Sequence, residues 1–210
     1  MSRRSFLVTS AAAVWAGAWQ RHAAAASPPA AKLGKAAPPF SVADTGGRQR
    51  TLAEFKGKIV VLEWTSTSCP YAAAQYSSRS MPELQRWATG KGVVWLSVLS
   101  THPSRSDYLA PAQAEAFNRQ RGGVPTALLI DGSGGMGQTY GALTADHMFI
   151  VAANGTLVYA GGIDDSESQD PKEVAVSHNH VRAAITDLLA GRRVAKPSTE
   201  PFGCSVNYAG

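Results

Sequence analysis

Residues 59–72 read IVVLEWTSTSCPYA, an aliphatic run that passes through a polar turn to a single cysteine. The aliphatic run predicts a buried strand, and the residues after Cys69 have helical potential. Ala72 stands where a CxxC motif would place its second cysteine, so Cys69 supplies only half of such a dithiol. We therefore expect the function of the chain to be decided at Cys69.

A thiol at Cys69 would face the N-terminus of the following helix. Unpaired backbone N–H groups and the helix dipole favour an anion there. Such a position can lower the pKa of a cysteine from about 8.5 to between roughly 3.5 and 7.5, which yields thiolate near neutral pH. The sequence therefore predicts that Cys69 is the reactive sulfur.

The one other cysteine, Cys204, lies 135 positions later. In one arrangement Cys69 is oxidised, for example to a sulfenic acid, and Cys204 displaces water to form a disulfide that an external thiol reductant resets. A permanent bridge is the second arrangement, and a loop of this length could contribute up to about 5 kcal/mol. Two unconnected thiols are the third. We favour the redox pair, because a domain of this size does not need a covalent bridge.

Residues 1–26 have the order of charged, apolar and small-residue regions that is typical of an export signal. Arg3 and Arg4 fit the twin-arginine route. The apolar part, residues 6–19, is shorter than the stretch of about 20 residues that spans a membrane. We therefore expect cleavage near Ala26, export to the periplasm or beyond, and no membrane span in the mature chain. A retained N-terminal anchor is the alternative.

The formal charge of the whole chain is +5, but the leader contributes much of it. Cleavage would remove three of the 20 basic side chains and none of the 15 acidic ones, which leaves 17 against 15. Since the remainder has no basic stripe, nucleic acid is not an expected partner. The remaining residues, about 184, suit one domain with its own core.

Hydrophobic patterning and turn signals predict the elements of the mature chain. Asn154 and Gly155, between two apolar runs, are a strong hairpin signal. Ser80, three residues before Glu83, makes a capping-box pattern and is expected to open the second of two helices after Cys69. Short extended elements and strands are predicted over 40–44, 49–55, 59–62, 93–99, 126–131, 147–152 and 156–160, and further helices over 111–121, 138–142 and 181–189.

This order of elements predicts an α/β fold in which a mixed central β-sheet is covered by helices on both faces. Residues 27–36, rich in Ser, Pro, Ala and Lys, are expected to form a flexible spacer. The domain is expected over 37–192, followed by a C-terminal tail over 193–210 that carries Cys204.

Several stretches share the pattern of one family: LGKAAPPF at 33–40, FKGKIVVL at 55–62, LID at 129–131, YGA at 140–142, and FIV with GTLVYAG between 149 and 161. In these stretches the chain resembles the redoxin branch of the thioredoxin superfamily, the alkyl hydroperoxide reductase and thiol-specific antioxidant group. The resemblance implies a thioredoxin-like fold. It also implies a thiol-dependent oxidoreductase that reduces a small peroxide or exchanges with a protein thiol or disulfide, and that needs no cofactor.

The chain departs from the pattern of that family near the cysteine. Peroxiredoxins carry proline seven and threonine three residues before it, where this chain has Leu62 and Ser66, so only the hydroxyl is kept. Relatives commonly place a cis-proline just before the strand at 147–152, and Asp146 stands there instead. A cis bond without proline costs about 2.5 to 4 kcal/mol, so we expect a trans peptide.

Ser66, Pro70, Asp146 and His147 are thus the residues expected to support Cys69. An ionised Asp146 would oppose thiolate formation, whereas His147 would favour it if it turned toward the sulfur. In the alternative interpretation Asp146 caps a turn and His147 is an ordinary residue at a strand end.

A non-catalytic copper- or zinc-binding module is the main alternative from another class. It would use Cys69, His147 and Cys204, because thiolate and imidazole ligands suit these metals. The two-cysteine spacing of metal-delivering relatives is absent, since Ala73 occupies that place. A structural member of the family that keeps a static bridge is the third alternative.

Overall fold

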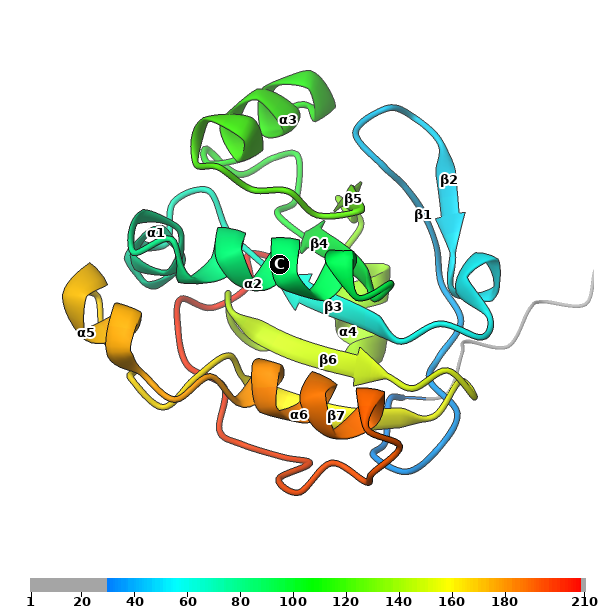
Figure 1. Ribbon diagram of the computed structural model, residues 1–210. Coiled ribbons are helices and arrows are strands. Elements are labelled where there is room, and N and C mark those ends of the chain that lie inside the picture. The colour runs from blue at the N-terminus through cyan, green and yellow to red at the C-terminus, as the bar shows by residue number, and fades with distance from the viewer. Residues whose placement is uncertain (1–29, 209–210) are drawn as a thin grey trace, which may run out of the picture.

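A five-stranded sheet forms the centre of the computed structural model, which describes residues 30–208 (Figure 1). Its strands are β3 (Val60–Trp64), β4 (Val94–Leu99), β5 (Ala127–Ile130), β6 (His147–Val151) and β7 (Leu157–Gly162). They lie in the order β5-β4-β3-β6-β7. β3, β4 and β5 are parallel and β6 is antiparallel to both of its neighbours, so the predicted mixed sheet is confirmed.

Helices cover both faces of this sheet (Figure 1). They are α1 (Pro70–Ser77), α2 (Ser80–Gly90), α3 (Pro111–Gln120), α4 (Gly135–Tyr140), α5 (Pro171–Val176) and α6 (His180–Leu189). Successive residues of a strand point to opposite faces, so Val61 joins the core formed with α2 and α6, whereas Val60 and Leu62 join the core formed with α4. The predicted layered α/β fold is confirmed.

Two helices differ from the sequence-based predictions. The helix α5, which follows the N-cap Asp170, is not among those predicted. The capping box is wrong, since Ser80 is already the first residue of α2 and Arg79 is its N-cap, in the left-handed conformation with φ 69°. Two residues separate α1 from α2, and one of them, Ser78, accepts from the Ser80 N–H at 3.3 Å through its hydroxyl.

The packed domain extends beyond its expected limits at both ends of the described chain. The backbone N–H groups of Ala31 and Gly34 donate to the domain at 3.0 and 2.8 Å, within the expected spacer. Ser198 and Ser205 of the expected tail form β-bridges with it.

The export signal predicted over 1–26 lies outside the described residues. Among residues 30–208, no helix is long and apolar enough to cross a membrane.

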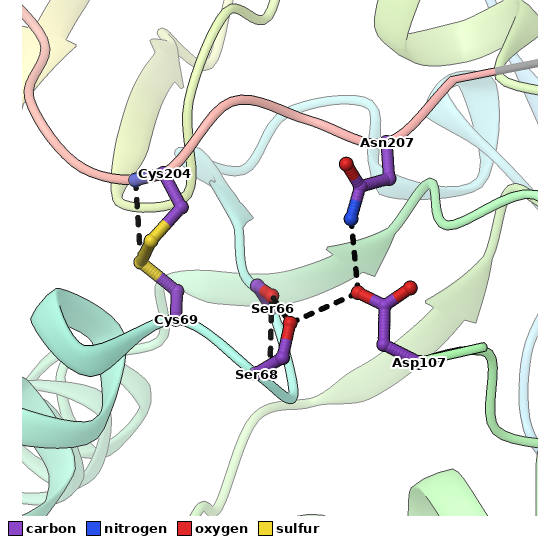
Figure 2. The surroundings of a disulfide bond; sticks show 6 residues. All are labelled: Ser66, Ser68, Cys69, Asp107, Cys204 and Asn207. Carbon is purple, nitrogen blue, oxygen red and sulfur yellow. Dashed lines mark hydrogen bonds between the residues drawn. A yellow bond between two sulfur atoms is a disulfide. The ribbon is translucent and has the colours of Figure 1, made fainter. Parts of the chain in front are cut away.

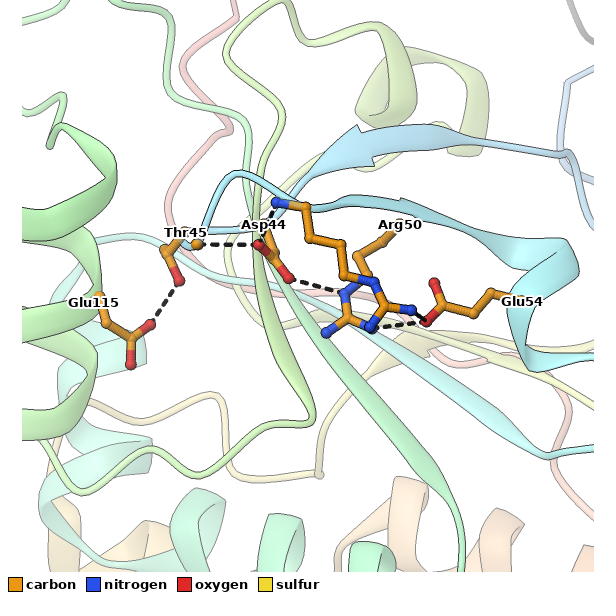
Figure 3. Close-up of polar contacts among 7 residues, drawn as sticks. Asp44, Thr45, Arg50, Glu54 and Glu115 are labelled. Atoms are coloured by element: carbon orange, nitrogen blue, oxygen red, sulfur yellow. Dashed lines mark hydrogen bonds and ion pairs between the residues drawn. The ribbon is translucent and has the colours of Figure 1, made fainter.

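A small hairpin packs beside the β5 edge of the sheet (Figure 1). It consists of β1 (Ser41–Ala43) and β2 (Gln49–Thr51), followed by the 3-10 helix η1 (Leu52–Phe55). Arg50 holds it together, because its guanidinium donates to Asp44 and to Glu54, each at 2.8 Å (Figure 3). The Thr45 hydroxyl donates to Glu115 of α3 at 2.7 Å, which ties α3 to the hairpin.

The buried carboxylate of Glu63 joins β3 to β4, α1 and α2. Glu63 has no exposed surface. It accepts four hydrogen bonds of 2.6 to 2.9 Å from the side chains of Tyr76, Gln85, Trp95 and Ser97. Each of these donors is itself buried, so the carboxylate satisfies polar groups that water cannot reach.

We expect Glu63→Leu to lower the free energy of unfolding by at least about 3 kcal/mol, because it leaves several buried donors without an acceptor. Urea denaturation measures the change. Glu83→Leu, at an exposed glutamate of α2, is the matched control and should change stability by less than about 1 kcal/mol. Equal effects of the two substitutions would contradict a stabilising role for the buried network.

Candidate functional site

Cys69 and Cys204 form a disulfide with a Cα–Cα distance of 5.7 Å (Figure 2). Cys69 is the N-cap residue of α1 and Pro70 is the first residue of that helix. The backbone N–H of Cys204 donates to Cys69 Sγ at 3.2 Å. The arrangement with two unconnected thiols is thus not the one the structure adopts. In a reduced pair, this N–H and the helix N-terminus would both stabilise a Cys69 thiolate.

The loop before Cys69 is fixed by its own hydroxyl groups. The Ser66 hydroxyl accepts from the Ser68 N–H at 3.2 Å, and the Ser68 hydroxyl donates to Asp107 at 2.9 Å. Ser66 therefore shapes the turn, and its hydroxyl is engaged within the loop rather than with a sulfur. The same Asp107 oxygen accepts from the Asn207 amide at 2.9 Å (Figure 2). Asp107 thus connects the Cys69 loop to the segment that carries Cys204.

The tail is bound on both sides of Cys204. The Ala145 N–H donates to the Cys204 carbonyl oxygen at 2.8 Å, and the Val206 N–H donates to the Leu143 carbonyl oxygen at 3.0 Å. Just before the cysteine, Gly203 has φ 116° and lies so close to the Ala145 carbonyl oxygen that a Cβ would collide with it. Only glycine suits this position. The second sulfur is therefore held in place by backbone contacts as well as by the disulfide.

Asp146 lies directly after Ala145, which packs against the disulfide. The structure has no cis peptide bond within residues 30–208, so the predicted trans bond is confirmed. Asp146 instead takes the left-handed conformation, φ 65°, and its N–H donates to the Trp64 carbonyl oxygen at 2.7 Å. Its side chain is fully buried, and neither carboxyl oxygen has a hydrogen-bond partner among the described residues.

This environment favours the neutral acid at Asp146. Burial is the main cause that raises the pKa of the Asp146 carboxyl well above its usual range, and the charge of Glu63 raises it further. The expectation that an ionised Asp146 opposes a thiolate is therefore not supported, because the group carries its proton where an ordinary aspartate has lost it.

His147 is packed as a strand-end residue. Its Nδ1 accepts from the Leu143 N–H at 3.2 Å, and its ring stacks on Phe149 with centroids 4.3 Å apart. Burial lowers the pKa of His147 to about 4, so the ring is neutral near pH 7. Within residues 30–208, no three His, Cys, Asp or Glu side chains are grouped to hold a metal ion, so the alternative copper or zinc set of Cys69, His147 and Cys204 is not assembled.

A pocket of about 480 Å³ opens beside Cys69. This volume lies in the range of sites that hold small ligands or side chains, roughly 300 to 1,000 Å³. Cys69 lines it, whereas Cys204 does not. The rest of its wall comes from the loop before Cys69, from α1 and from the end of α3: Ser66, Thr67, Ala73, Tyr76, Ser77, Phe117, Gln120 and Arg121.

The sequence pattern of the AhpC/TSA family matches residues 33–160, more than half of the chain. The chain belongs to this family. The match contains Cys69 but ends before Cys204, so the second cysteine comes from a segment that the family pattern does not include. A search of curated proteins finds no match.

Solved structures share the fold. An uncharacterized conserved protein from Geobacillus kaustophilus has a TM-score of 0.72 and 23% identity, over 87% of this chain and 95% of its own. A hypothetical protein from Sinorhizobium meliloti 1021 has a TM-score of 0.71 and 23% identity, over 87% and 97%. A candidate protein disulfide isomerase from Bacteroides thetaiotaomicron has a TM-score of 0.54 and 20% identity, over 76% and 91%. The thioredoxin-like fold is thus confirmed.

Several residues of the site carry no motif in the sequence. Asp107 and Asn207 lie 100 positions apart and meet only in the folded chain. Arg121 ends a helix whose pattern gives no hint of a pocket. The sequence held one signal for the fixed position of Cys204: the preceding residue is Gly203, and a glycine can mark a close approach of two backbone segments.

The neutral Asp146 predicts a specific dependence of stability on pH. A group whose pKa is raised by folding stabilises fully below its unfolded pKa of about 3.9, and loses this contribution as the pH rises toward its folded pKa. Wild-type protein should therefore lose about 1.4 kcal/mol per pH unit relative to Asp146→Asn from about pH 4 upward. Urea denaturation between pH 4 and 8 measures the difference.

Asp165→Asn is the control, since Asp165 is exposed and its substitution keeps an oxygen to accept from the His178 N–H. It should leave the pH profile unchanged. Parallel profiles for wild type and Asp146→Asn would show that Asp146 ionises normally and would refute the prediction.

Proposed function

We propose that this protein is a thiol–disulfide oxidoreductase in which Cys69 and Cys204 are the redox-active pair. The observation that carries the proposal is the placement of the pair: Cys69 lies at a helix N-terminus and on a pocket wall, and Cys204 is bonded to it from an anchored tail. Membership of the AhpC/TSA family supports a thiol-based reaction.

The reaction follows from the roles of the two sulfurs. In the reduced protein, the Cys69 thiolate attacks a substrate disulfide, forms a mixed disulfide and releases the first substrate sulfur as a thiolate, which takes a proton from solvent. The Cys204 thiol then loses its proton and attacks Cys69 Sγ, which releases the second substrate sulfur. The substrate gains two electrons and two protons, the pair becomes a disulfide, and an external dithiol reverses the change.

Exchange with disulfides is favoured over peroxide reduction by two observations. The proline and threonine of peroxiredoxins are replaced by Leu62 and Ser66, and Ser66 makes its hydrogen bond within its own loop. The tail is also bound on both sides of Cys204, so both thiols stay adjacent after reduction. A permanent dithiol exchanges directly and needs no sulfenic acid intermediate.

Incubation in glutathione buffers of graded potential, followed by alkylation and mass spectrometry, tests the redox pair. We expect the Cys69–Cys204 disulfide to form and break reversibly between dithiothreitol and oxidised glutathione. Cys204→Ser should accumulate a mixed disulfide at Cys69, whereas Cys69→Ser should accumulate little, because Cys204 lacks the helix N-terminus. A bridge that resists dithiothreitol in the folded protein would identify a static disulfide. Rapid oxidation by hydrogen peroxide alone would favour a peroxidase.

We also propose that the protein is exported through the twin-arginine pathway. The order of charged, apolar and small residues over 1–26 supports this, as does a disulfide, since disulfides persist in oxidising compartments. In a bacterial host with this pathway, wild-type protein should appear in the exported fraction, and the combined Arg3→Lys and Arg4→Lys substitutions should retain it inside. Export of both forms would refute the twin-arginine route, and retention of both would refute export.

A further inference from the structure

Arg121 is the one charged residue among those that line the pocket beside Cys69. It follows directly after α3, and its backbone N–H donates to the Phe117 carbonyl oxygen at 3.1 Å. The pocket therefore combines a reactive sulfur with a single guanidinium and an otherwise uncharged wall.

The guanidinium of Arg121 is held in a fixed position. Its Nη1 donates to the Thr65 hydroxyl at 3.1 Å, and its Nε and Nη2 each lie 3.4 Å from the Asn118 side-chain oxygen. Its central carbon lies 3.6 Å from the ring centroid of Tyr76 and 5.1 Å from that of Phe117. These contacts orient the group, and they are all with uncharged partners.

Arg121 has capacity left for an anion. A guanidinium has five N–H donors, and the contacts above use three of them. The ion pairs within residues 30–208 join other arginines to aspartates and glutamates, and none includes Arg121. A partly buried guanidinium with free donors matches the planar, two-oxygen geometry of a carboxylate.

Arg121 also has a structural role, because its charge lies near a buried carboxylate. The Tyr76 hydroxyl under the guanidinium donates to Glu63 at 2.7 Å, so the positive charge also lies near the buried carboxylate. Yet Glu63 is already bonded to four neutral donors, and no hydrogen bond joins it to Arg121 among the described residues. The charge therefore helps to balance Glu63 at a distance, while the free donors remain available in the pocket.

We propose that the pocket selects thiol and disulfide substrates that carry a carboxylate next to the reacting sulfur, such as a cysteine flanked by an acidic residue in a protein. The inference rests on the proposed redox function of Cys69 and adds its substrate class. Arg121 would bind the carboxylate while the substrate sulfur meets Cys69. It is a specificity-determining residue, and the exchange steps are those given above.

Two aromatic disulfides of similar size test the charge preference. Dithiobis(nitrobenzoate) carries one carboxylate on each half, and dithiodipyridine is neutral. Stopped-flow absorbance gives the rate at which each reagent oxidises the reduced full-length protein. Each rate is divided by the rate of the same reagent with a small neutral thiol, which corrects for the different intrinsic reactivities of the two reagents. We expect the normalised preference for the anionic reagent to fall about ten-fold in Arg121→Gln, the loss of one charge-assisted contact.

Arg119→Gln is the matched control, because Arg119 is an exposed arginine of α3 outside the pocket wall. It should leave the preference unchanged, and Arg121→Lys should keep part of it. If Arg121→Gln slows both reagents equally, the arginine acts only on the thiolate and the inference fails while the redox function stands. If Arg121→Gln does not fold, the two reagents are compared with Arg121→Lys instead, and an equal slowing of both again contradicts the inference. If the reduced wild type reacts with neither reagent, the proposed redox function itself fails.

Discussion

The hydrogen bond from the Ala145 N–H to the Cys204 carbonyl oxygen is the contact on which the site depends. It holds the C-terminal tail against the residues that precede β6, and this places the second sulfur at the N-terminus of α1. Gly203 permits the close approach, and Asp107 bonds to both the Cys69 loop and the tail. A dithiol is thus built from residues 135 positions apart, without the helical spacing of a CxxC motif.

Asp146 lies directly before β6 and directly after the residue that packs against this pair. Its N–H donates to the Trp64 carbonyl oxygen, and its backbone adopts a left-handed conformation. Backbone strain of this kind in a residue other than glycine costs on the order of 1 to 3 kcal/mol. The buried, unpaired carboxyl adds a further penalty. Two unfavourable features thus coincide at one position, directly after the residue that packs against the disulfide.

The sequence predicted the sheet and the place of Cys69 at the start of a helix well, because both depend on local patterns. Apolar runs marked β3, β4 and β6, and the strand-to-helix junction marked Cys69. The pairing of Cys69 with Cys204 was favoured because these are the two cysteines of the sequence, and the structure has this bond. The wall residue Arg121 and the orientation of His147 could not be predicted, since each depends on contacts between segments far apart in the chain. The helix begins at Ser80 as expected, but the capping box is wrong because the N-cap is Arg79 and the hydroxyl that accepts from the Ser80 N–H belongs to Ser78.

Two fully buried carboxyl groups, Glu63 and Asp146, differ in their hydrogen-bond partners, and Arg121 lines the pocket beside Cys69. Glu63 is buried but accepts four hydrogen bonds, so its carboxylate is solvated by the protein. Asp146 is equally buried and has no donor, so the neutral acid is favoured there. Arg121 lines the pocket, and its hydrogen bonds within the described residues use three of its five donors. Cys69 and Arg121 line one pocket, so in the proposed reaction the charge of Arg121 favours both a Cys69 thiolate and the anionic substrates inferred for it.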